Sequence, residues 1–324
     1  DKEVNTGSRV LAPMYATGFA SQEQVLQAYR AEHAEVWAMN ARLPVTEDDT
    51  AGARAKFDQN KIEMLFPGVT VISNPVGMTY KPFNDLIDRI NNDPVAGNTI
   101  ATVAKDSVHV TLYDLFCLSE YPGKFQDQLN KDVQNEIIKV IREKGFITDA
   151  AKADAAYWVV ARRVAEVINR FKSSGEVPAF KPLQLSIFPP AAHGAASVLV
   201  MSMQPASARD LAIVTKLQDE IRAETGIDYP WKNFRAHMTL GYLIKPVGES
   251  EKEAFTNSLR QLDAFIKQEA LNANNKLDLP TFELAYFAGM NKFAKIISYD
   301  WAKSQPVEQL DGAQVERIYN AQKA

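Results

Sequence analysis

Two short segments with the same pattern constrain the fold of this chain more than any other feature. The sequence reads HVTL at positions 109–112 and HMTL at positions 237–240, so the two segments begin 128 residues apart. Because side chains alternate between the two faces of a strand, the histidine and threonine of each segment project from one face and the apolar pair from the other. Only four histidines occur in the whole chain. The repetition therefore predicts two related lobes, each with a buried strand that carries a polar face.

The surroundings of the two segments repeat as well. Residues 70–72 are rich in β-formers, and a helical pattern begins at Pro82 before the first segment. A strand over 198–203 and a helix over 207–224 precede the second segment, with Gly226 expected to end that helix. The spacing from strand to histidine is 39 residues in the first case (70 to 109) and 36 in the second (201 to 237). This agreement supports the duplication independently of the motifs.

The chemistry available to such a pair of segments is specific. Two imidazoles that face each other across a cleft can act as general base and general acid, because unperturbed histidine titrates near ~6.5. A threonine hydroxyl beside each ring can donate a hydrogen bond to a phosphoryl oxygen. The candidate catalytic residues are therefore His109, His237, Thr111 and Thr239.

Alternation along the same two strands gives the candidate substrate-binding residues. Ser107 and Tyr113 share a face with the first histidine, and Arg235 shares a face with the second. An arginine matches phosphate geometry and a tyrosine ring can stack on a base, although either residue could equally lie at the rim with its tip in solvent. Tyr242 has the wrong parity for the cleft unless a bulge intervenes.

The neighbours of the two histidines also predict a division of roles. The fixed positive charge of Arg235 disfavours a protonated ring two residues away, so it should lower the pKa of His237 and make that residue the base. His109 has Ser107 in the equivalent place and becomes the acid.

The pair of His-x-Thr-x segments resembles the signature of the two-histidine (2H) phosphoesterase superfamily, which includes RNA 2′,5′ ligase-like proteins and cyclic nucleotide phosphodiesterases. KFD at 56–58, FPGVTVI at 66–72 and FAGMNKF at 287–293 are similar to a bacterial and fungal branch known as the DUF1868 domain. The resemblance covers roughly residues 56–300. That branch more often has Asn where this chain has Val69. The resemblance implies a substrate such as a 2′,3′-cyclic phosphate or a 2′,5′-linked oligonucleotide.

We accordingly expect an α+β fold: a bilobal, duplicated arrangement of two antiparallel-rich sheets that flank a central cleft, with helices outside. Residues 1–55 form an N-terminal extension with one helix, and residues 56–324 form the bilobal domain. The expected activity is metal-independent hydrolysis of a cyclic or 2′,5′-linked phosphodiester by the two histidines. The alternative is a non-catalytic module that binds a nucleotide or an RNA end in the same cleft, although binding alone does not need two groups that titrate near neutral pH.

Composition limits the partners. The 40 acidic and 36 basic residues are mixed along the chain and give a net charge of −4, without the basic arm typical of duplex DNA binding. A small or short phosphodiester is the better substrate, and we expect a monomer. No spacing typical of a metal site and no glycine-rich phosphate loop occurs, so no metal and no cofactor is expected. The single cysteine, Cys117, allows no internal disulfide and is expected to be a small buried residue.

Two expectations concern the location of the protein. No apolar run is long enough to span a membrane. The numbering begins at Asp1 rather than at a methionine, which favours a mature exported protein, periplasmic or secreted, over a cytoplasmic one.

The remaining patterns are expected to be structural. A helix from Ser21 places His33 in an apolar stripe, where it should pack in the core, and residues 42–55 should form a linker. His193 is expected in a solvated loop. Other elements are expected at these positions: helices over 125–145, 157–171 and 249–272, and strands over 183–188, 281–287 and 293–299.

Overall fold

The computed structural model describes residues 21–33, 43–74, 81–117, 123, 127–188, 197–228, 234–272 and 276–324. Its strands are β1 (Gly68–Ser73), β2 (Ile100–Thr102), β3 (Val110–Cys117), β4 (Ala179–Phe188), β5 (Val198–Pro205), β6 (His237–Leu243), β7 (Leu277–Asp278), β8 (Thr281–Gly289), β9 (Lys292–Asp300) and β10 (Gln305–Pro306). They form one ten-stranded antiparallel sheet in the order β10-β9-β8-β1-β3-β6-β5-β4-β7, and β2 also pairs with β6. The expected α+β class is confirmed.

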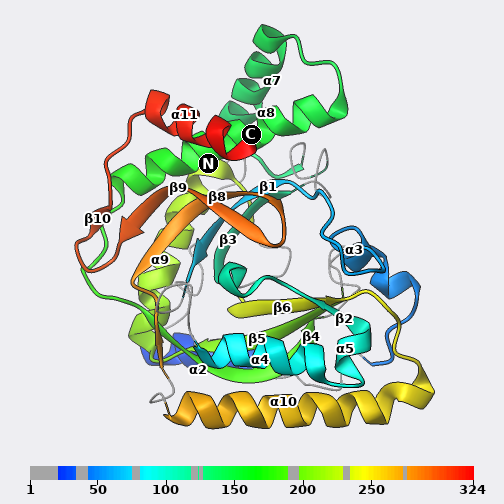
Figure 1. Cartoon of the computed structure of the whole chain (residues 1–324). Helices are drawn as coiled ribbons and strands as arrows, with labels where there is room; N and C mark the ends of the chain where they lie inside the picture. Colours follow the sequence, from blue (N-terminus) through cyan, green and yellow to red (C-terminus); the bar gives the residue numbers. More distant parts are fainter. Residues whose placement is uncertain are drawn as a thin grey trace.

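Helices cover this sheet. They are α2 (Gln22–His33), α3 (Ala51–Arg54), α4 (Lys81–Asn92), α5 (Ala96–Thr99), α7 (Lys131–Lys144), α8 (Asp149–Arg170), α9 (Ala208–Thr225), α10 (Lys252–Asn272) and α11 (Gly312–Lys323), with short 3₁₀ turns η1 (Asp48–Thr50), η2 (Lys105–Ser107) and η4 (Glu249–Glu251). α8 and α11 pack on β8 and β9, whereas α10 packs on β4 and α4 (Figure 1). No helix in these ranges is long and apolar enough to cross a membrane.

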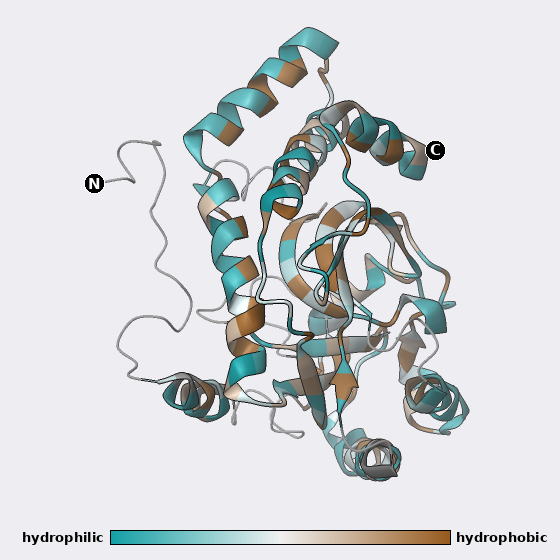
Figure 2. Ribbon diagram, turned by 90° about the vertical axis from the view of Figure 1, so that its left-hand side faces the viewer, coloured by the Kyte–Doolittle hydropathy of each residue, from teal (hydrophilic) through white to brown (hydrophobic). Residues whose placement is uncertain are grey.

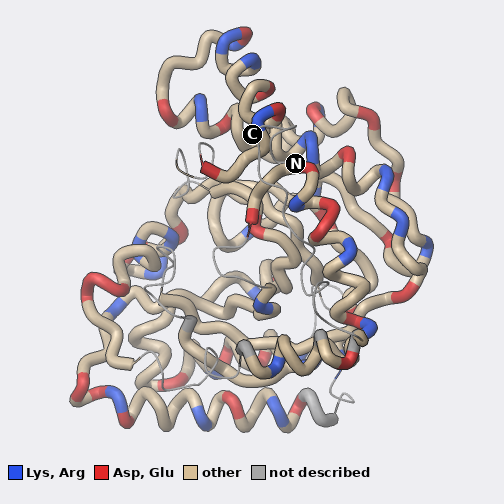
Figure 3. Tube along the Cα trace, turned by 180° about the vertical axis from the view of Figure 1, so that it is seen from behind, with Lys and Arg blue, Asp and Glu red and all other residues tan. Residues whose placement is uncertain are grey.

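The helices have the two faces that this packing requires. In α8, Val160, Val164 and Val167 recur at helical spacing and are all completely buried, as the sequence predicts. Figure 2 shows hydrophobic residues along the curled sheet and on the helix surfaces turned toward it. Acidic and basic residues follow one another along α10 (Figure 3). Burial of the apolar stripes therefore holds the helices on the sheet, and the mixed charges remain in solvent.

The predicted strand, helix, strand order is confirmed around the second motif, where the chain runs β5, α9, β6. Around the first motif β1 and α4 are present as expected, but α5, β2 and η2 come between α4 and β3. The Ser207 hydroxyl accepts a hydrogen bond from the Asp210 amide at 3.3 Å and caps α9. Gly226 ends that helix with φ of +80°, and its amide donates to the Arg222 carbonyl at 2.8 Å. β3 and β6 then meet in the middle of the sheet, where Val110 pairs with Met238.

Each motif strand contains a β-bulge at the same motif position. β1 pairs with β3 through Ile72↔Thr111 and Val71↔Tyr113, which leaves Leu112 without a partner on β1. β5 pairs with β6 through Val200↔Thr239 and Leu199↔Gly241, which leaves Leu240 without one on β5. A bulge reverses the alternation of side chains beyond it. The two residues that follow either leucine therefore have the opposite parity to the one read from the sequence, and in β3 a second bulge at Leu115 restores the original parity.

The N-terminal residues are part of the core. The helix expected from Ser21 is present as α2, and Tyr29 within it is completely buried. Residues 43–55 are packed rather than forming the expected linker: Val45 pairs with Val247, and Val45 and Ala53 are buried. Burial of the apolar side chains in the core stabilises this packed arrangement, although the turn-forming residues of the segment are typical of a linker. Of the helix expected over 125–145, the structure describes α7 from Lys131 onward, and residue 125 lies outside the described residues.

Candidate active site

The four motif side chains lie on one face of the central strands. His109, Thr111, His237 and Thr239 are each half-buried, whereas the apolar residues between them are completely buried. His109 directly precedes β3, and His237 is the first residue of β6. Because the two strands are antiparallel with Val110 opposite Met238, each histidine is placed beside the threonine of the other motif. The structure thus brings together the four residues that the sequence selected.

Both imidazole rings are held by the same local hydrogen bond. The Nδ1 atom of His109 is 2.6 Å from the Ser107 carbonyl oxygen, and Nδ1 of His237 is 2.8 Å from the Arg235 carbonyl oxygen. A carbonyl oxygen can only accept, so Nδ1 carries the hydrogen in each ring. In the neutral form Nε2 is then the unprotonated nitrogen. Each ring can therefore accept a proton at Nε2 without changing its orientation.

Burial lowers the pKa of both histidines. For His109 the pKa falls from 6.5 to about 4 because of burial, while the bond to Ser107 raises it and the nearby charge of His237 lowers it. For His237 burial is again the main cause of a lowered pKa, and the charge of Arg235 adds to it. Both rings are neutral at pH 7 in the free protein. Burial is the main cause of the lowered pKa in both rings, so it outweighs the expected effect of Arg235 on the pKa of His237. The division into base and acid stays a prediction.

The bulge at Leu112 removes Tyr113 from the site. Tyr113 is completely buried, and its hydroxyl donates to the Ile227 carbonyl oxygen at 2.5 Å. Its expected position on the face of His109 is wrong, because the unpaired Leu112 reverses the parity. Ser107 does not present its hydroxyl to the site either, since it is buried and donates to the Ala104 carbonyl at 2.8 Å. What Ser107 supplies is the carbonyl oxygen that orients His109.

The same bulge places a residue in the site that the sequence reading missed. Asp114 pairs with Thr70 of β1 and is exposed, and its negative charge raises the pKa of both His109 and His237. Only a group near both rings can have this effect. On β6 the equivalent position is Tyr242, which the second bulge turns to the face of Thr239. The pairing of β3 with β1 would have identified Asp114, and this pairing cannot be read from the sequence.

Arg235 is half-buried and lies near both His237 and Tyr29, since its charge lowers the pKa of each. It remains the candidate phosphate contact. The Lys56 ammonium is a second cation on this side: it lies 4.8 Å from the centre of the Tyr242 ring and 5.1 Å from that of Phe66. No carboxylate within the described part of the chain pairs with it.

An aromatic ring flanks His109. The ring of Phe293, at the start of β9, lies 4.3 Å from the His109 ring between their centres, at an interplanar angle of 59°. Phe293 is half-buried, so part of its ring is open. The asparagine of the preceding turn holds this hairpin in place, because the Asn291 side chain accepts from the Ala104 amide at 2.8 Å. The sequence predicted the strands of this hairpin and its resemblance to the family, but gave the segment no part in the site.

The threonine hydroxyls of Thr111 and Thr239 make no hydrogen bond to the residues that the structure describes. They are therefore available to a ligand. Cys117 is half-buried rather than fully buried. Within the described ranges, no group of three or more His, Cys, Asp or Glu residues is placed to bind a metal ion. The His33 side chain and all of His193 lie outside the described residues.

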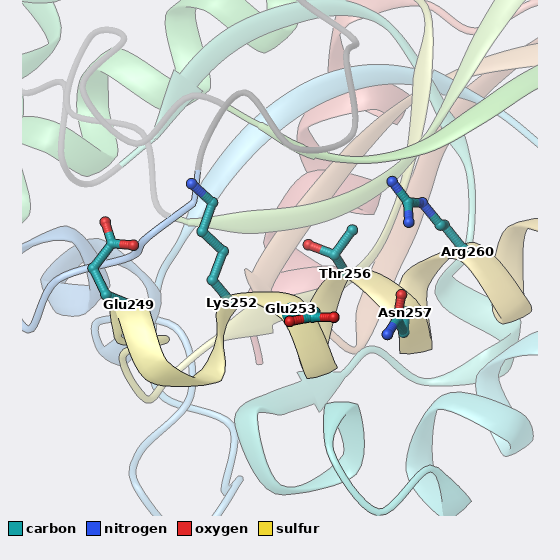
Figure 4. A pocket seen from close by; sticks show the side chains of 6 residues that line it. All are labelled: Glu249, Lys252, Glu253, Thr256, Asn257 and Arg260. Carbon is teal, nitrogen blue, oxygen red and sulfur yellow. The ribbon is translucent and has the colours of Figure 1, made fainter.

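A shallow hollow on α10 is separate from this face. It is lined by Glu249, Lys252, Glu253, Thr256, Asn257 and Arg260 (Figure 4). All six side chains come from one stretch of helix and its preceding turn, their charges are of both signs, and none belongs to a motif strand. We assign no ligand to this hollow.

Comparison with known proteins identifies a related fold but no activity. No protein-family model matches the chain, and no curated protein matches it. Among solved structures, a conserved protein of unknown function from Agrobacterium tumefaciens aligns with a TM-score of 0.54 at 16% sequence identity, over 74% of this chain and 89% of that one. At this identity the match shows a shared fold alone.

Proposed function

We propose that the sheet consists of two duplicated lobes of the 2H phosphoesterase type, related by an axis between β3 and β6. Several pairs of equivalent residues support this, each 128 positions apart. The bulged residues are 112 and 240, and the partners of the two threonines on the neighbouring strands are Ile72 and Val200. Matching bulges at matching positions are an unlikely product of convergence, because a bulge is a local insertion tied to one register. The two halves of the sheet meet at the pair between Val110 and Met238.

We further propose that the protein is a phosphodiesterase that works by acid–base catalysis between His109 and His237. The observation that carries this is the pair of half-buried rings with the same Nδ1 anchor, which makes Nε2 the proton-exchanging nitrogen of each ring. In this reaction one neutral Nε2 accepts a proton from the attacking water, a new P–O bond forms, and the P–O bond to the leaving group breaks. The other ring, protonated, donates its proton to the departing oxygen.

The negative charge of the substrate itself favours protonation of one ring. A phosphodiester carries one negative charge at pH 7, and an anion close to an imidazole raises its pKa. Two rings that are neutral in the free protein therefore take up one proton as the phosphodiester binds. Thr111 and Thr239 donate to the phosphoryl oxygens, and Arg235 balances their charge.

The substrate class is a cyclic or 2′,5′-linked nucleotide phosphodiester. Family resemblance gives the linkage, and the open side of the Phe293 ring beside His109 offers a stacking surface for a base. The step needs no metal, because two histidines suffice for the proton transfers.

A non-catalytic nucleotide-binding or RNA-end-binding module is the second candidate. The low pKa of both rings favours it, since neutral rings in the free protein provide no acid until a ligand raises one of them. A slowly hydrolysed phosphorothioate analogue that binds equally to the unaltered protein and to the histidine variants, without turnover of any phosphodiester, would identify this alternative.

The test is a screen of cyclic dinucleotides, 2′,3′-cyclic nucleotides and 2′,5′-oligoadenylates in the presence of excess chelator, followed by phosphorus NMR. His109→Ala and His237→Ala should each lower the rate at least ~100-fold, the usual contribution of one general acid or base. His193→Ala, which removes a histidine outside both motifs that the sequence places in a solvated loop, should leave the rate unchanged. Full activity in both motif variants, or activity restored only by a divalent ion, would refute the proposal.

A further inference from the structure

A buried tyrosine of the N-terminal helix lies next to the strand that carries His237. Tyr29 of α2 has an exposed fraction of 1%. Its hydroxyl donates to the Met203 carbonyl oxygen at 2.8 Å and accepts a hydrogen bond from the Ala236 amide at 3.0 Å. These two partners are backbone groups, one near the end of β5 and the other directly before His237.

This hydroxyl stands where the ladder between β5 and β6 ends. The Met203 amide donates to the Ala236 carbonyl at 2.9 Å, which is one of the two bonds that an antiparallel pair normally exchanges. The reciprocal connection, from the Ala236 amide to the Met203 carbonyl, passes through the Tyr29 hydroxyl. The tyrosine hydroxyl therefore stands between the Ala236 amide and the Met203 carbonyl, which are separated by its oxygen atom, whereas the Met203 amide contacts the Ala236 carbonyl directly.

The separation affects the orientation of the catalytic ring. The chain on the N-terminal side of Ala236 continues to Arg235, whose carbonyl oxygen anchors Nδ1 of His237 at 2.8 Å. If Ala236 paired directly with Met203, this carbonyl would move with the strand, and the ring of His237 would follow it. Burial raises the pKa of the Tyr29 hydroxyl, so the hydroxyl keeps its proton and donates at every pH at which the protein is folded.

We propose that Tyr29 is a positioning residue for His237, and that the N-terminal helix is a working part of the active site. The helix lies in the segment that the family resemblance does not cover. The tyrosine hydroxyl holds β6 at the register and spacing that direct Nε2 of His237 into the site. The catalytic consequence rests on the proposed phosphodiesterase function, whereas the effect on the ring does not.

The chain contains a matched control. Tyr299 of β9 is also completely buried, and its hydroxyl also joins two backbone groups: it donates to the Phe171 carbonyl at 3.0 Å and accepts from the Ser173 amide at 3.1 Å. Three strands, β8, β1 and β3, lie between β9 and β6 in the sheet. Tyr299→Phe therefore removes a buried hydroxyl that also bridges two backbone groups, lies 3.3 Å from the Ser304 Oγ atom as well, and has no connection to His237.

The experiment compares Tyr29→Phe with Tyr299→Phe by nitrogen NMR of the histidine side chains, with signals assigned from His→Asn variants. Tyr29→Phe should change the Nδ1 and Nε2 shifts and the titration of His237 and leave those of His109 unchanged, and Tyr299→Phe should change neither. With a substrate in hand, Tyr29→Phe should also lower kcat roughly tenfold at nearly constant KM and shift the pH profile, as expected for a misplaced catalytic group.

Identical His237 signals in the two variants would overturn the proposal. If no substrate is ever found, the ring signals still decide it, so failure of the enzymatic function and failure of the positioning role are distinguishable. Should Tyr29→Phe not fold, the unaltered protein provides a second measurement: a slowly exchanging Tyr29 hydroxyl proton with a nuclear Overhauser contact to the Ala236 amide. Absence of that contact would refute the bridge itself.

Discussion

The lowered pKa of His109 makes the folded protein sensitive to mild acid. Its pKa is about 4 in the folded state, against 6.5 for an ordinary histidine. As pH falls below 6.5 the unfolded chain takes up this proton first, so the free energy of unfolding decreases as the pH falls toward 4. Above pH 6.5 the ring is neutral in both states, and its contribution to the free energy of unfolding is fully present. This contribution is lost as the pH falls, because the folded state binds fewer protons than the unfolded chain.

The magnitude follows from the two pKa values. For a shift from 6.5 to about 4, lowering the pH from 7 to 5 removes about 2 kcal/mol of stability. The ring is half-buried, so water that reaches it reduces this figure, which is an upper limit. His237 acts in the same direction, since burial lowers its pKa as well.

The assay is urea unfolding at pH 7 and pH 5, for the unaltered protein and for His109→Asn. Asparagine can keep an N–H donor to the Ser107 carbonyl oxygen and does not titrate. The loss of stability between the two pH values should be smaller in the variant, by up to about 2 kcal/mol. This comparison cancels the contributions of the carboxylates, which are common to both proteins. An equal loss in the two proteins would show that His109 has an ordinary pKa and that the site is open to water.

Three further predictions concern the site and the strands that form it. Asp114→Asn should lower the pKa of both motif histidines, because it removes a negative charge that raises them, and an unchanged NMR titration would place this carboxylate outside the site. Thr111→Val and Thr239→Val should each reduce kcat by an amount equivalent to about 1 to 3 kcal/mol, and full activity in both would assign the hydroxyls to strand structure. Gly241→Ala should lower the free energy of unfolding by about 1 to 3 kcal/mol, since a methyl group there would lie 2.8 Å from a carbonyl oxygen of β2. Gly312→Ala, with nothing within 4 Å of the new methyl group, is its control in urea unfolding, and equal losses would contradict the close contact.

The sequence determined the local elements and the identity of the four central residues. The apolar spacing of α8, the Ser207 cap and the Gly226 stop of α9 depend on contacts within a few residues, so they can be read along the chain. The polar face of each motif follows from alternation over its first three positions, from histidine to threonine, which precede the bulge at the fourth position. The same reasoning places His109 and His237 with their threonines.

Only the tertiary structure decided what surrounds those four residues. Whether Leu112 and Leu240 are paired depends on β1 and β5, which lie elsewhere in the chain, and each unpaired leucine exchanges the faces of the two residues that follow it. That exchange replaced Tyr113 by Asp114 in the site. Tyr29 reaches the same region across more than two hundred residues of sequence, because its ring is buried between α2 and the sheet while its hydroxyl satisfies two backbone groups. Contacts of this kind leave no periodic signal, since their partners are set by the packing of the whole chain.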